Sequence, residues 1–97
     1  MRFLHILEAV HFEKAIAIND NAEPLLGLAS CLSSKDIELA LSLAKKALIK
    51  NPNYVNYDYR KEQWWGEKLQ ASTEILLQNE QLKKDVILAK SKITESS

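Results

Sequence analysis

The chain nearly repeats itself at an interval of 32 positions. Each copy has apolar residues at helical spacing and ends in a polar breaker. The matching positions are Leu7 with Leu39, residues 12–16 with residues 44–48, and Asn19 with Asn51. A period near this length is typical of helical repeats, in which each unit buries its apolar face only against its neighbours. The pattern therefore predicts stacked helices, with binding rather than catalysis as the expected function.

Composition limits the fold class further. The 97 residues include only two glycines and two prolines, and 46% are hydrophobic. Leu, Ala, Lys, Glu and Ile dominate, and these residues favour helices. A chain of this length has room for one domain, which buries roughly 60–65% of the surface that the unfolded chain exposes. We therefore expect residues 1–97 to form a single all-α domain.

The charge balance excludes several classes of partner. There are 13 basic and 13 acidic residues, so the formal net charge is zero. Nucleic-acid-binding domains usually carry a basic surplus that neutralises phosphates.

The longest apolar runs are far shorter than the ~20 residues that span a bilayer. Cys31 is the only cysteine, so no intramolecular disulfide can form. We expect a cytoplasmic protein that binds neither nucleic acid nor membranes.

Breakers divide the first half of the chain into three helices. A broad apolar face over residues 2–18 predicts the first. Pro24 fits only in the first turn of a second helix, which begins just before it. Gly27 lies inside that helix and indicates that a neighbouring helix approaches closely. A third helix, capped by a serine of Ser33-Ser34, ends at Asn51-Pro52.

The second half is less clearly divided. From Tyr54 to about Gln78 the pattern is that of one long amphipathic helix, interrupted only by Gly66. After a weak break at residues 78–80, a last apolar stripe is formed by Leu82, Val86, Ala89 and Ile93. Periodicity leaves open whether residues 54–94 form one bent helix or two antiparallel helices. Two are favoured, because one helix would leave both stripes unburied. The last residues should fray.

Several small residues and breakers fall in an order that resembles the tetratricopeptide repeat (TPR) family. The matching positions are Leu26-Gly27, Ala40, Ala44, Ala47 and Pro52. Residues 61–69 are similar to the segment after the last repeat in many cyanobacterial TPR proteins. The resemblance implies the C-terminal portion of a repeat array, a TPR-like stack of antiparallel helix pairs. Its parts would be the second helix of a partial repeat (1–20), a complete repeat (21–52), C-terminal capping helices (53–94) and a frayed tail (95–97).

The family's function is to bind peptides or helices of other proteins in a groove lined by the first helices of the repeats. Some members clamp a partner's terminal carboxylate with lysine and asparagine on that groove. The matching positions here are Pro24 and Leu28, which cannot do so. The resemblance therefore implies a scaffold-type protein-binding module without a carboxylate clamp.

No motif in the sequence indicates catalysis, a metal or a cofactor. His5 and His11 are six residues apart, so they lie on different sides of a helix and cannot share one metal ion. The chain has no glycine-rich phosphate loop. Acidic pairs such as Asp36 and Glu38 are better explained as charges at a helix start. We expect a protein that is not an enzyme and holds no cofactor.

An aromatic cluster between Tyr54 and Trp65 is where we expect function. Adjacent residues of a helix point about 100° apart, so the two tryptophans should not be equally buried. We expect Trp65 to plug the end of the stack and Trp64 to be an exposed anchor, since Trp, Tyr and Arg dominate interface hot spots. The groove should be lined by residues 21–32 and 57–71. The expected partner contacts are Leu25, Leu28, Arg60, Trp64 and Lys68.

Two alternatives remain open from the sequence. The first helix lacks a partner on its N-terminal side, so Phe3, Leu7 and Val10 could mediate self-association. The chain could also be a fragment or helical subunit of a larger TPR-containing protein, such as a transferase. Neither alternative changes the expected all-α fold.

Overall fold

A computed structural model describes residues 10–16 and 21–96. Residues 10–16 are helical, and no strand occurs in either range, which confirms the all-α class. The later elements are α2 (Ala22–Leu32), α3 (Ile37–Lys50), the 3-10 helix η1 (Pro52–Val55), α4 (Tyr57–Glu62), α5 (Glu67–Leu77), the 3-10 helix η2 (Glu80–Leu82) and α6 (Lys83–Ser96). None of these helices is long and apolar enough to cross a membrane.

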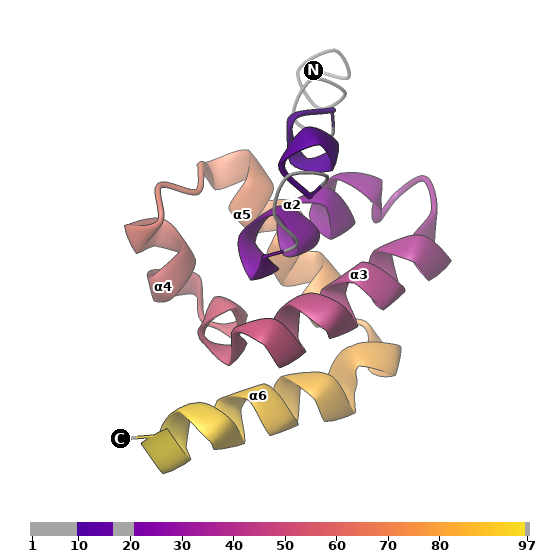
Figure 1. The fold of residues 1–97 in the computed structure, drawn as a ribbon. Helices are drawn as coiled ribbons and strands as arrows, with labels where there is room; N and C mark the ends of the chain where they lie inside the picture. The colour runs from indigo at the N-terminus through magenta and orange to yellow at the C-terminus, as the bar shows by residue number, and fades with distance from the viewer. Residues whose placement is uncertain (1–9, 17–20, 97) are drawn as a thin grey trace.

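Helix α2 is the centre of the fold. Every residue from Leu25 to Cys31 is buried, as expected for a helix that neighbours enclose on all sides. Figure 1 shows α2 between α3 and α5, with residues 10–16 above it. Gly27 makes the contact with residues 10–16 possible, because a Cβ at this position would collide with the ring of Phe12. The predicted close approach at Gly27 is therefore confirmed.

The hairpin between α2 and α3 has its predicted position but a different cap. The carboxylate of Asp36, not a serine, accepts a hydrogen bond from the N–H of Leu39 at 3.2 Å and caps α3. The expected serine cap is wrong because the hydroxyl of Ser33 donates instead to the carbonyl of Ser30, at 2.9 Å. The predicted end of α3 before Asn51 is confirmed.

The long helix predicted from Tyr54 to Gln78 is wrong. This stretch forms η1, α4 and α5, with a turn at residues 63–66 between the last two. Asn51 favours the first interruption, since its side-chain oxygen accepts from the N–H of Asn53 at 3.1 Å and starts η1. The break before Glu80 is confirmed.

Helix α6 packs mainly against η1 and α3 rather than pairing with α5. Figure 1 shows it running beside α3 at the edge of the molecule. The predicted stripe runs from η2 into α6 and faces inward: Leu82 and Ala89 are buried, and Val86 and Ile93 are half-buried. The predicted stripe is confirmed, whereas the expected antiparallel partner is wrong.

Candidate functional site

The turn that ends α4 places Trp64 in an unusual backbone conformation. The N–H of Trp64 donates to the carbonyl of Lys61 at 3.0 Å, and the N–H of Trp65 donates to the carbonyl of Arg60 at 3.2 Å. These two bonds are those of a Schellman motif, with Gln63 as the C-cap residue. Trp64 occupies the following position, which requires a left-handed conformation and usually holds glycine. Its φ is 68°, the only positive φ of a non-glycine residue among the described residues.

The turn also separates the two tryptophans. Trp65 is only 8% exposed and packs against the ring of Tyr54 at a centroid distance of 5.9 Å. Trp64 is 93% exposed. The expected difference in burial is confirmed, but its cause is the left-handed turn rather than the 100° step of a continuous helix. The turn also places Trp64 outside both α4 and α5, so it lies on no helix face with Lys68.

A surface hollow of about 540 Å³ lies beside Trp64. Its apolar lining comes from Phe12, Trp65 and Leu69, and its charged lining includes Glu23, Glu67 and Lys68. The remaining lining residues are His11, Gln63, Trp64 and Gly66. The hollow therefore combines an exposed aromatic edge with an apolar lining and charges of both signs. An extended apolar side chain or a short peptide segment fits this chemistry.

Next to the turn, a buried polar network surrounds Arg60. Its Nε donates to Oε1 of Gln70 at 2.7 Å, its Nη1 to the carbonyl of Tyr54 at 2.8 Å, and its Nη2 to Oε1 of Glu74 at 2.6 Å. The amide of Gln70 in turn donates to the carbonyl of Tyr57 at 3.0 Å. Burial lowers the pKa of Arg60, and the carboxylate of Glu74 opposes that shift. The network joins η1, α4 and α5 into one unit that holds the turn.

Of the five predicted contact residues, three are buried and two are exposed. Arg60 is 0% exposed, and Leu25 and Leu28 are buried in α2. These three side chains are not on the surface, because Arg60 is enclosed by its own hydrogen-bond partners and α2 is the central helix. Trp64 and Lys68 are exposed and both line the hollow. Partner binding by these two residues stays a prediction.

Sequence reasoning missed the other residues that build this site. The repeat pattern places Phe12 in a repeat helix and gives Gln70 no particular role. The sequence does contain a signal for Gln70. It is spaced three residues from Thr73 and seven from Leu77, so the three side chains lie on the same, buried face of α5. A polar side chain at a buried position needs a hydrogen-bonding partner, and the guanidinium of Arg60 is that partner.

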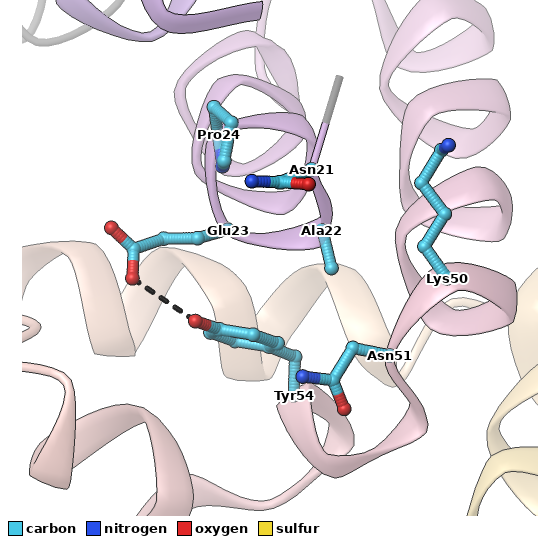
Figure 2. Close-up of a pocket in the computed structure, with 7 residues that line it drawn as sticks. All are labelled: Asn21, Ala22, Glu23, Pro24, Lys50, Asn51 and Tyr54. Carbon is cyan, nitrogen blue, oxygen red and sulfur yellow. Dashed lines mark hydrogen bonds between the residues drawn. The ribbon is translucent and has the colours of Figure 1, made fainter. Parts of the chain in front are cut away.

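A second hollow, of about 420 Å³, lies between the start of α2 and the end of α3. Figure 2 shows its lining: Asn21, Ala22, Glu23, Pro24, Lys50, Asn51 and Tyr54. The hydroxyl of Tyr54 donates to Oε2 of Glu23 at 3.0 Å, and the Asn51 side chain bonds to the N–H of Asn53 and to the hydroxyl of Tyr59. These groups hold α2 against η1, so we assign this hollow a structural role.

Other predicted features give no site. Within residues 10–16 and 21–96, no group of three His, Cys, Asp or Glu side chains is placed to hold a metal ion. His5, Phe3 and Leu7 lie outside the described residues, so the proposed self-association face is represented only by Val10, which is exposed. Cys31 is buried in α2.

Comparison with known proteins adds no further assignment. No family model, no curated protein and no solved structure matches this chain. Function is therefore inferred from the geometry around Trp64.

Proposed function

We propose that this chain is a protein–protein interaction module of the TPR type that acts in the cytoplasm without catalysis. Its contact surface is centred on Trp64 and the adjacent hollow, in place of the broader groove expected from residues 21–32 and 57–71. The observation that carries the proposal is a tryptophan that is almost fully exposed in a conformation suited to glycine.

The energetics of the turn support this assignment. A left-handed conformation costs a residue other than glycine roughly 1–2 kcal/mol. In the monomer the Trp64 side chain is almost fully exposed, so burial of the indole offsets little of this cost. Unfavourable backbone conformations of this kind cluster at functional sites. Tryptophan is also among the residues that contribute most to binding energy at interfaces. A partner that buries the indole accounts both for its exposure in the monomer and for the unfavourable backbone conformation that presents it.

The charges near Trp64 favour a protein partner over a nucleic acid. A stacking surface for single-stranded nucleic acid combines aromatic rings with a positively charged groove. Here Glu23 and Glu67 line the hollow together with Lys68, and the whole chain has no net charge. A mixed, partly apolar surface matches the composition of protein interfaces.

Affinity capture with variants of the full chain tests the proposal. Trp64→Gly removes the indole and suits the backbone of the turn, so it should abolish specific capture without unfolding the chain. Ile87→Ala is the matched control, because Ile87 is also a largely exposed apolar residue but lies on α6. It should capture the same proteins as the wild type. Capture that is equal for all three chains would contradict the proposed surface.

A further inference from the structure

The patch around Trp64 contains both a projecting side chain and a hollow that could accept one. Trp64 stands at the edge of the hollow and is not packed into it, since it is 93% exposed. The hollow of about 540 Å³ has room for a side chain of this size next to Phe12 and Leu69. When a projection and its receptor lie in one patch, a two-fold rotation brings each projection against the other copy's receptor. The patch is thus self-complementary in shape.

The charges are compatible with the same arrangement. Two copies of a surface with a single sign of charge repel each other, but this lining carries Glu23, Glu67 and Lys68. At long range, equal numbers of acidic and basic residues leave no net charge to oppose association. Charge therefore does not strongly oppose the association of two copies.

On the basis of the proposed function, we infer that the partner of this surface is a second copy of the chain. In this two-fold dimer, Trp64 of each copy occupies the hollow of the other and contacts Phe12 and Leu69 there. Each hollow is completed by a residue that the other copy contributes. Gly27 belongs to the arrangement indirectly, because its missing side chain leaves the space in which the Phe12 ring lies.

The area available indicates whether such a dimer is stable or transient. An aromatic side chain buries about 150–250 Å², so two indoles and the matching linings bury roughly 600–1,000 Å² in total. Stable interfaces bury about 1,200–2,000 Å², and smaller ones belong to transient complexes. The dimer should therefore be transient and reversible.

Sedimentation velocity over a concentration series tests the inference. The wild type should pass from monomer to dimer between about 10 μM and 1 mM, and Ile87→Ala should behave in the same way. Trp64→Gly removes an indole from each copy, so it should weaken dimerisation at least about a hundredfold, roughly tenfold for each of the two hot-spot side chains. A wild type that stays monomeric throughout, or a Trp64→Gly chain that dimerises equally well, overturns the inference.

Intermolecular NMR contacts locate the interface. In a mixture of isotope-labelled and unlabelled chains, nuclear Overhauser effects should connect the Trp64 indole of one copy to the Phe12 ring of the other. A dimer that shows contacts elsewhere overturns the arrangement. The proposed function fails separately: a monomeric chain whose capture of another protein depends on Trp64 contradicts the dimer but supports the interaction surface.

Discussion

The carbonyl of Arg60 accepts the N–H of Trp65 at 3.2 Å, while the guanidinium of the same residue is fully buried among three acceptors. One residue thus terminates α4 through its backbone and joins α4 to η1 and α5 through its side chain. The exposed Trp64 lies between these two anchored residues in sequence and is held in place by both. Its presentation is a property of the fold, not of a loose loop.

Replacing Trp64 by glycine should stabilise the monomer. Glycine adopts the left-handed conformation without steric cost, so the free energy of unfolding should rise by about 1 kcal/mol. For a domain of this size that corresponds to an increase in Tm of about 4–8 °C. Thermal and urea unfolding, followed by circular dichroism at low protein concentration, measure the change. Trp64→Ala is the control and should bring no comparable gain, because alanine retains the backbone cost. Destabilisation by Trp64→Gly would mean that the indole stabilises the monomer.

Replacing Arg60 should be strongly destabilising, even by lysine. Arg60→Met leaves the buried acceptors of Tyr54 and Gln70 without their donors, and breaking a buried charge network costs about 3–5 kcal/mol. Arg60→Lys should be nearly as harmful, because a single ammonium group cannot reproduce the directions of a guanidinium. Glu74→Gln should cost less, since its amide oxygen still accepts from Arg60 and the side chain is 42% exposed. Urea unfolding gives the ranking, and a near-wild-type Arg60→Lys chain would contradict the role of the network.

The effect of Gly27→Ala should depend on Phe12. Alanine is favoured over glycine inside a helix by about 1 kcal/mol, but in the wild type its Cβ collides with the Phe12 ring. In a Phe12→Ala background that collision is absent, so Gly27→Ala should be stabilising. A double-mutant cycle measured by urea unfolding isolates the coupling between the two positions. Additive effects would show that residues 10–16 do not pack on α2 in solution.

Tyr54 should make the fold sensitive to alkaline pH. Burial, reinforced by the hydrogen bond to Glu23, raises the pKa of the Tyr54 hydroxyl above its ordinary value. The unfolded chain releases this proton near pH 10, whereas the folded chain retains it. The stability that this hydroxyl contributes is therefore fully present below about pH 10 and is lost as the pH rises further. Tyr54→Phe should lack this loss. Urea unfolding of both chains across that range measures it, and parallel pH profiles would contradict the assignment.

The first half of the fold could be predicted because its signals are local. Pro24 and the Asn51-Pro52 pair set helix ends by steric restriction and by their own hydrogen bonds, whatever the rest of the chain does. The cap of α3 was harder to assign, because Ser33 and Asp36 are both suitable caps. The choice depends on where the Ser33 hydroxyl bonds, which is a result of the folded turn.

The turn at residues 63–66 could not be predicted for a related reason. The usual signal of a Schellman turn is glycine in the left-handed position, and here that position holds Trp64. Gly66 lies two residues later, where φ is negative and glycine is not required. The burial of Arg60 was equally hidden, since arginine is mostly exposed in proteins. Only the meeting of η1, α4 and α5 creates the acceptors that make its burial possible.

The buried network around Arg60 affects how much entropy is lost when Trp64 binds a partner. Hydrogen bonds are directional, so three of them from one guanidinium fix the angle between α4 and α5 more strictly than apolar packing would. The backbone that carries Trp64 is therefore ordered before any encounter, and only two side-chain torsions of the indole remain to be fixed. Such preorganisation lowers the entropy lost on association. A small contact area can then give a measurable affinity, and substitutions in the buried network can weaken binding without changing any surface residue.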